Sequence, residues 1–436
     1  MRPHRAELPT RMKWRGWVAA ALAVALLAAA CLPTSESTAA GATVVTVFGP
    51  WRGRTADNFR AALAPFEART GIDVRYTGTG SFAELIVKRL EDGDPPDVAM
   101  FPQPGMLADL AARGLVLPLR DDVGTAALTS YHTPIASYVE GLEEQIHGIL
   151  YGLNLKSLVW YPPQTFAEKG YQIPTTWDEM DTLAERMIAD GFSPWCLGVA
   201  AFDSSGWPAT DWVEDIVLRF AGIEIYDEWV AGDIPFTDDA IRNAFARFQA
   251  MTLQSGRAVG GRRGALNTPT GVAQDPMFDD PPGCLMHRQA TFQISNLPPA
   301  TDIGPAGDTN VFILPGVGAS TSPPLLIGGE FAAALTDRDE TWQLMSYLAT
   351  PEAGEAWAAA GGFISPHATF ESDRYGTTFD ARMGQLLGDA DVVRFDGSDL
   401  MPPAIGTRSF FDAMVLYIGT GRLDDALQLA QSGYDQ

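Results

Sequence analysis

The stretch FDSSGWPATDWVED, residues 202–215, places two tryptophans among four carboxylates. An indole ring offers a flat apolar surface on which the C–H face of a sugar ring can pack. A carboxylate accepts strong hydrogen bonds from hydroxyl groups. Pro208 is typical of a first helical turn, so Trp207 should stand at the helix entrance with Asp211 close to it on the first turn. We therefore predict that Trp207 and Asp211 contact a hydroxylated ligand.

The other residues of this stretch have competing interpretations. Trp212 begins a helically spaced apolar stripe that ends at Phe220, which is typical of a core position, although its ring could also join the ligand site. The carboxylate of Asp211 would also suit a helix N-terminus, where it stabilises the helix dipole. Glu214 and Asp215 are predicted to lie on the solvated face of the helix.

Further candidate ligand contacts lie in loops after predicted strands or at glycine-rich turns. They are Trp51, Ser81, Gln103, Asn154, Arg288, Glu330 and Phe363. Aromatic rings supply stacking surfaces, and the polar side chains supply donors and acceptors for ligand hydroxyls. Three of these residues have a structural alternative: Gln103 can brace a proline-rich turn, Asn154 can cap backbone, and Arg288 can pair with an acid.

Ser81 lies in GTGSFA, residues 78–83, which matches the dinucleotide-binding pattern GxGxxA. The match is weak, because it lies on the second predicted strand-to-helix turn and glycine is common at any tight turn. We predict instead that Ser81 caps a helix whose N-terminus offers backbone N–H groups to a hydroxylated ligand. No cofactor is expected.

The order of the predicted elements indicates an α/β protein. Residues 43–49 form a β-branched run, and the helically spaced segment after it stops at Gly71. A second strand, a second helix and a third strand that ends at Phe101 follow. This order predicts a mostly parallel sheet flanked by helices, with ligand-binding loops at the carboxyl ends of the strands. Residues 146–162 are predicted to cross into a second α/β lobe.

The chain is strongly acidic, with 30 basic and 54 acidic residues and a formal charge of −24. The first 31 residues hold five of the basic residues and one acid, so the chain beyond them carries −28. Such a surface repels nucleic acid and anionic lipid headgroups, which leaves neutral and cationic ligands.

The N-terminus is typical of an export signal. A basic stretch precedes an apolar run over residues 17–30, which is shorter than the roughly 20 residues of a transmembrane helix. The stretch LLAAAC resembles a bacterial lipoprotein signal, in which Cys31 is lipidated after cleavage. Ordinary cleavage at a nearby alanine is the alternative and would give a periplasmic or secreted protein. Residues 1–31 are then the signal peptide and 32–42 a flexible tether.

Cys196 and Cys284 are the two cysteines beyond the export signal. In an oxidising compartment an even pair favours a disulfide, whereas two buried thiols are the alternative. A zinc site is disfavoured because neither cysteine has a CxxC partner and only His287 is near in sequence. No metal is expected.

From Thr43 onward the chain resembles the extracellular solute-binding proteins of ABC sugar importers, and it is most similar to their α-glucoside-binding branch. The resemblance is carried by FEARTGIDVRYTGTGSFAELIVKRLEDGDPPDVAMF, YGLNLKSLVWYP, PTTWDEM, GWPATDWVEDIVLR, GCLMHRQATF, GGEFAAAL and ATPEAGEAWAAAGGFISP. Their shared order is more specific than any single segment. It implies a two-lobed fold of the type II-like periplasmic binding proteins, with an oligosaccharide bound in the cleft between the lobes.

The resemblance also implies the partners and the division of the chain. We expect a monomeric receptor, held by its lipid at the outer face of the cytoplasmic membrane, that delivers sugar to an ABC permease with a cytoplasmic ATPase. The N-terminal lobe is assigned to residues 43–150 and the main part of the C-terminal lobe to 151–315. Residues 316–372 return to the N-terminal lobe through hinge crossings, and helices within 373–436 brace the lobes.

Two other function classes compete with a sugar receptor. A glycoside hydrolase needs two carboxylates about 5–10 Å apart, but an acid-rich chain offers many such pairs, and the sequence contains no GxSxG, HExxH or P-loop motif. A receptor for a cationic solute such as a polyamine fits the acidic charge and is the harder rival. We predict a receptor without catalytic activity.

Overall fold

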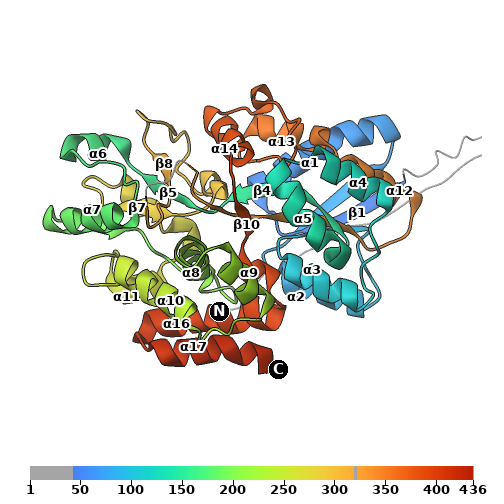
Figure 1. Cartoon of the computed structure of the whole chain (residues 1–436). Coiled ribbons are helices and arrows are strands. Elements are labelled where there is room, and N and C mark those ends of the chain that lie inside the picture. Colours follow the sequence, from blue (N-terminus) through green and yellow to red (C-terminus); the bar gives the residue numbers. More distant parts are fainter. Residues whose placement is uncertain (1–42, 319–321, 436) are drawn as a thin grey trace, which may run out of the picture. The chain divides into compact units, whose positions relative to one another are not determined.

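The computed structural model describes residues 43–318 and 322–435 (Figure 1). The predicted signal peptide, Cys31 and the tether lie outside these residues. Among the helices of the described part, none is both long and apolar enough to cross a membrane.

Six strands form the sheet of the N-terminal lobe: β1 (Val44–Gly49), β2 (Asp73–Gly78), β3 (Val98–Phe101), β4 (Gly148–Leu155), β9 (Leu325–Ala334) and β10 (Val393–Phe395). Their order is β10-β9-β3-β1-β2, and β4 also pairs with β9. β1 is parallel to β2 and β3, and β10 is parallel to β9. β9 is antiparallel to β3 and β4, so this late segment of the chain completes a sheet begun at the N-terminus.

Four strands form the sheet of the C-terminal lobe: β5 (Leu158–Tyr161), β6 (Ser193–Trp195), β7 (Cys284–Arg288) and β8 (Asn310–Ile313). Only β6 and β7 are parallel, whereas β5 is antiparallel to both β7 and β8. The prediction of mostly parallel pairing therefore does not describe this sheet. β5, the strand that enters from the other lobe, runs opposite to both of its neighbours.

Helices flank both sheets. Those of the N-terminal lobe are α1 (Gly53–Thr70), α2 (Phe82–Glu91), α3 (Pro104–Ala112), α4 (Asp121–Ser130), α5 (Thr133–Ile146), α12 (Asp339–Leu348) and α13 (Glu355–Ala360). Those of the C-terminal lobe include α6 (Pro163–Lys169), α7 (Trp177–Ala189), α8 (Trp207–Phe220), α9 (Ile223–Ala231), α10 (Asp239–Thr252), α11 (Gly261–Asn267), α16 (Phe410–Thr420) and α17 (Leu423–Gln431). Two more, α14 (Thr378–Gly388) and α15 (Gly397–Leu400), flank β10 in the chain. Although α16 and α17 come last, they pack beside α8, α10 and α11 (Figure 1).

Local signals explain where helices begin and end. The Thr176 hydroxyl accepts a hydrogen bond from the backbone N–H of Glu179 at 3.2 Å, and the Glu179 carboxylate accepts one from the backbone N–H of Thr176 at 3.3 Å. These two bonds form a capping box at the start of α7. Gly71 ends α1 at φ 73°, a conformation that favours glycine.

Among the elements of residues 43–318 and 322–435, three connections link the two lobes. We call residues 156–157, between β4 and β5, the first crossing. The second crossing joins β8 to β9, and its described ends include Leu314 and Pro324. The third crossing leaves β10 at Asp396 and continues through α15 toward α16. Each crossing links an element of the N-terminal lobe to one of the C-terminal lobe.

The division predicted at residue 151 falls inside β4, which stays in the first sheet as far as Leu155. Gly152 lies at a register shift of β4 against β9. A Cβ at this position would lie 2.9 Å from the ring of Phe363. Glycine at this position therefore allows an aromatic ring to pack against the strand.

Cys196 and Cys284 form the predicted disulfide, with their Cα atoms 5.4 Å apart. Cys284 begins β7, and Cys196 directly follows β6, the parallel neighbour of β7. The bond therefore joins two adjacent strands that are distant in sequence.

The double variant Cys196→Ala/Cys284→Ala should lower the free energy of unfolding by about 2–4 kcal/mol, because the unfolded chain loses a long covalent loop. Urea denaturation of the exported protein measures the change. The control is a thiol assay on unfolded, non-reduced wild type. Two free thiols beyond Cys31 would contradict the disulfide.

Candidate functional site

A cavity of about 300 Å³ is lined by residues of both lobes. Its volume lies at the lower end of the range typical of small-molecule sites. Its wall on the N-terminal lobe comes from β4 and β9, from the loops after β1 and β3, from Thr55 of α1, and from α13 and the loop after it. The opposite wall comes from η3 (Thr291–Ser295), a short 3₁₀ helix after β7 in the C-terminal lobe.

Aromatic rings form much of the cavity wall. The rings of Trp51 and Trp357 meet edge to face, with centroids 4.9 Å apart, and Tyr151 and Phe363 meet at 5.3 Å. These four side chains come from four separate segments and are almost entirely buried, so their neighbours hold the rings in place. Phe292 faces them from the C-terminal lobe.

Polar groups interrupt the aromatic wall. The indole N–H of Trp51 donates to Oε1 of Glu330 at 3.1 Å, which orients both side chains. Oδ1 of Asn154 accepts a hydrogen bond from the hydroxyl of Thr291 at 3.3 Å, so a contact between the lobes borders the cavity. Thr55, Ser295 and Asn296 complete the polar lining.

Glu330 is the one carboxylate among the described residues that line the cavity. Burial raises its pKa from 4.5 to about 7, and the hydrogen bond from Trp51 opposes that rise. Near neutral pH this group is therefore able to accept a hydrogen bond as a carboxylate or donate one as an acid. Either form suits a hydroxyl group, which is both donor and acceptor.

Of the ten predicted ligand contacts, Trp51, Asn154, Glu330 and Phe363 line this cavity. Trp207 lies next to it: its half-buried ring is 5.9 Å from the ring of Phe292. Contact of these residues with a solute stays a prediction.

Ser81 and Gln103 lie outside the cavity lining. Ser81 is exposed at the N-cap position of α2, but its hydroxyl does not bond the helix, so the predicted capping hydrogen bond is wrong. Gln103 occupies the N-cap position of α3 and is partly buried. Both residues are at the loop ends that the sequence indicated, and Pro102, the neighbour of Gln103, does line the cavity.

Helix α8 contradicts one sequence prediction. Glu214 and Asp215 are 0% exposed, so the expected solvated face does not exist. Trp212 packs in the core, with its ring 4.8 Å from that of Trp195 at nearly a right angle. The burial of the acids is possible because each carboxylate has buried partners.

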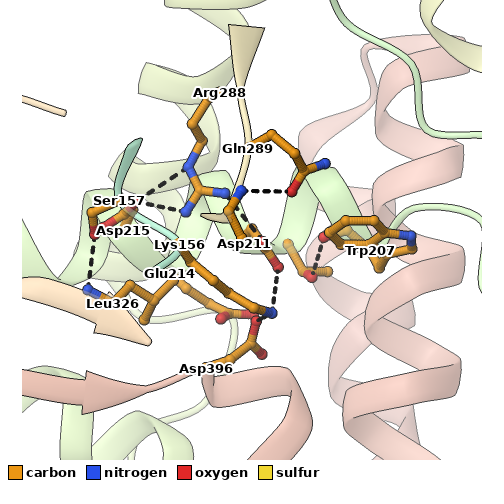
Figure 2. Close-up of polar contacts among 12 residues, drawn as sticks. Lys156, Ser157, Trp207, Asp211, Glu214, Asp215, Arg288, Gln289, Leu326 and Asp396 are labelled. Atoms are coloured by element: carbon orange, nitrogen blue, oxygen red, sulfur yellow. Dashed lines mark hydrogen bonds and ion pairs between the residues drawn. The ribbon is translucent and has the colours of Figure 1, made fainter. Parts of the chain in front are cut away.

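Figure 2 shows several partners of the α8 acids, among them Arg288, Lys156 and Ser157. Arg288 donates to Asp215 at 2.6 and 3.1 Å and to Asp211 at 3.1 Å. Nζ of Lys156 lies 3.3 Å from Asp211 and also pairs with Asp396. Asp211 and Arg288 therefore sit in a buried ion-pair network outside the cavity lining, which matches the structural alternative for Arg288.

Asp211, Glu214 and Asp396 place carboxylate oxygens within 4.8 Å of one another, a spacing that could hold a metal ion. The ammonium of Lys156 already pairs with two of these three acids. We therefore interpret the group as part of the ion-pair network.

Sequence reasoning missed Tyr151, Trp357 and Phe292. Tyr151 was placed in a crossing segment, and its neighbour Gly152 was a usable signal, since glycine permits close packing of an aromatic ring. Trp357 lies in the alanine-rich α13 and has the pattern of a core residue. Only the tertiary fold brings these rings to one cavity.

Glu330→Gln should become more stable than wild type as pH rises. The folded-state pKa of Glu330 is raised, so the stability linked to its proton is complete below about pH 4.5 and is lost as pH rises through about 7. The unfolding free energy of the variant minus that of wild type should increase by on the order of 1–3 kcal/mol between pH 5 and 8.

Urea denaturation at each pH measures this difference. Glu371→Gln, at an exposed position, is the matched control and should give a flat difference. A flat difference for Glu330→Gln would show that this carboxylate is not desolvated.

Comparison with known proteins gives sequence relatives over most of the chain. Residues 52–262 match the family model of the bacterial extracellular solute-binding proteins. The osmoprotective compounds-binding protein GgtB of Synechocystis sp. is 40% identical over 375 residues, which cover 86% of this chain and 88% of that protein. The alpha-glucosides-binding periplasmic protein AglE of Rhizobium meliloti is 35% identical over 400 residues, covering 90% of this chain and 87% of that protein.

Solved structures share the fold at lower identity. Maltose-bound MalE3 of T. maritima has a TM-score of 0.69 and 16% identity, with 90% of this chain and 100% of that chain covered. RafE in complex with raffinose has a TM-score of 0.67 and 16% identity, with 90% and 99% covered. These similarities confirm the predicted two-lobed architecture.

Proposed function

This chain belongs to the bacterial extracellular solute-binding proteins, the receptors of ABC importers, and we propose that its solute is an α-glucoside or a related small oligosaccharide. The observation that carries the proposal is the cavity walled by Trp51, Tyr151, Trp357 and Phe363, with Glu330 and Asn154 among the rings. The name of one relative supports it, since AglE is an alpha-glucosides-binding protein; GgtB, by its name, binds osmoprotective compounds.

The cavity chemistry fits a pyranose. The C–H face of the sugar ring packs on an indole or phenyl ring, which removes apolar surface from water. The equatorial hydroxyls bond to the Glu330 carboxyl group and the Asn154 amide, which together offer donors and acceptors. Because packing already fixes the rings, little side-chain entropy is lost on binding.

The cavity size and charge favour a small neutral solute. A volume of about 300 Å³ suits one or two sugar rings better than a long chain. A polyamine would contact the aromatic faces through cation–π interactions, but it would find one carboxylate for several positive charges. The known relatives are binding proteins, and we propose no catalysis.

Maltose, sucrose, trehalose and raffinose form the test panel, with spermidine as the cationic comparison. At least one of the sugars should raise the melting temperature, because a ligand at 100 times its dissociation constant stabilises by about 2.7 kcal/mol. Differential scanning fluorimetry measures the shift. Stabilisation by spermidine alone would overturn the sugar proposal, and release of monosaccharide from a stabilising sugar would indicate a hydrolase.

A pair of asparagine variants locates the site of any stabilising sugar. Asn154→Ala removes a cavity amide and should weaken the binding of that sugar by about tenfold, the equivalent of one lost hydrogen bond. Asn267→Ala, at an exposed position on α11, is the matched control and should bind as wild type does. Equal affinity of the two variants would place the sugar elsewhere.

We also propose that Cys31 carries the lipid that holds the exported receptor at the membrane. The proposal is supported by the export signal and by the family, whose members act outside the cytoplasm. Cys31→Ser should move the protein from the membrane fraction to the soluble fraction and abolish palmitate labelling. An unchanged distribution together with unlabelled wild type would favour ordinary signal cleavage.

A further inference from the structure

Helix α8 contacts all three crossings between the lobes through its buried polar face. That face carries Asp211, Glu214, Asp215 and Arg219. Figure 2 shows the three acids converging on residues of the crossings. None of the four side chains lines the cavity, so ligand contact does not explain why charges are buried at this place.

The first crossing is held at both of its residues. The Ser157 hydroxyl donates to Asp215 at 2.7 Å and accepts the backbone N–H of Leu326 on β9 at 2.8 Å. Nζ of Lys156 lies 3.3 Å from Asp211. Ser157 thus bonds to elements of both lobes at once.

The second crossing is held at its two ends. Arg219 pairs with Asp215 and donates to the carbonyl oxygens of Leu314 at 2.9 Å and Pro324 at 2.8 Å. One guanidinium group therefore fixes where the chain leaves β8 and where it enters β9.

The third crossing is held by carboxylates and by Lys156. Glu214 accepts the backbone N–H groups of Gly397 at 2.9 Å and Ser398 at 3.2 Å. Lys156 pairs with Asp396 and lies 3.6 Å from Asp399. Lys156 therefore joins the first crossing, the third crossing and α8.

Lys156 also lies near cavity residues of both β4 and β9. It follows Asn154 of β4 by two residues, and its stem crosses Gly328, which precedes Glu330 of β9 by two residues. A Cβ on Gly328 would lie 2.8 Å from Cε of Lys156, so the glycine makes room for this side chain. On the other side, Nζ lies 5.9 Å from the ring centre of Trp207.

We propose that Lys156 is a positioning residue for solute capture: it locks the first and third crossings to α8 and so sets how the cavity walls of the two lobes face each other. The proposal rests on the proposed function only in taking the cavity as the solute site. It assigns to Lys156 a role through Asn154 and Glu330, without contact to the solute.

The charges around Lys156 make the strength of these ion pairs depend on pH. Charged and titratable groups from four parts of the chain face Lys156 or the acids that pair with it. They are Asp211, Glu214, Asp215, Arg219 and Arg288 of the C-terminal lobe, Asp396 and Asp399 of the third crossing, Glu330 of β9, and Tyr226 of α9. Burial raises the pKa of Asp211 to about 7, and it also raises the pKa of Glu214 and Asp399. The ammonium of Lys156 lowers the pKa of Asp396 against the effect of burial.

Without the ammonium, these carboxylates repel one another when they are ionised. The repulsion weakens as the pH falls, because the carboxylates take up protons. Lys156→Met should therefore loosen the crossings at pH 7.5 more than at pH 5.5. The measurement is hydrogen exchange of the sugar-free protein, expressed as protection factors. We expect at least tenfold lower protection in residues 153–158 and 393–400 at pH 7.5, and a smaller loss at pH 5.5.

Lys88→Met is the matched control, since Lys88 pairs with Asp92 on the exposed face of α2, and it should keep wild-type protection. If Lys156→Met does not fold, Gly328→Ala displaces the Lys156 stem with its charge intact and should loosen the same two segments. Wild-type protection in a folded variant, or an equal loss across both lobes at both pH values, would overturn the proposal. Because no sugar is added, this outcome is independent of the sugar panel.

Discussion

The requirement that buried charges be paired governs how the two lobes are joined. Three cations, Lys156, Arg219 and Arg288, lie among the acids of α8 and the third crossing, away from water. An unpaired ion at such depth would be strongly unfavourable, so each side chain has a narrow range of positions. The crossings are restricted in the same way, because their side chains and backbone groups are the partners of these buried charges. The end of β4 and the start of β9, which join the crossings, are therefore fixed in position.

The cavity follows a different physical rule. Its rings come from separate segments of the chain and orient one another through edge-to-face packing, so no single loop determines the site. The hydrogen bond from Trp51 to Glu330 ties the stacking surface to the polar group of the same wall. The rings are already packed and the carboxyl group is already oriented. The site is therefore preorganised for hydroxyl-rich solutes.

The sequence was a good guide to features set locally and a poor one to features set by tertiary contacts. The helix end at Gly71 depends on a few neighbouring residues and was predicted. The disulfide was predicted because an even pair of cysteines in an oxidising compartment favours a disulfide over two free thiols. Glu214 and Asp215 were assigned to solvent because acids on a helix are usually solvated, and their partners lie far away in sequence. Trp357 was missed because a ring that lines a cavity and a ring that fills a core have the same local pattern.

The disulfide has a consequence for biosynthesis. Cys196 and Cys284 enclose α8 within a covalent ring, with a sequence separation of 88 residues. Before oxidation, α8 and β7 must meet by diffusion along an open chain; afterwards they belong to one closed loop. Arg288 lies just after Cys284, so the same bond keeps this cation near the acids of α8. A disulfide of this kind forms in an oxidising compartment, and once formed it shortens the chain search by which Arg288 reaches the acids of α8.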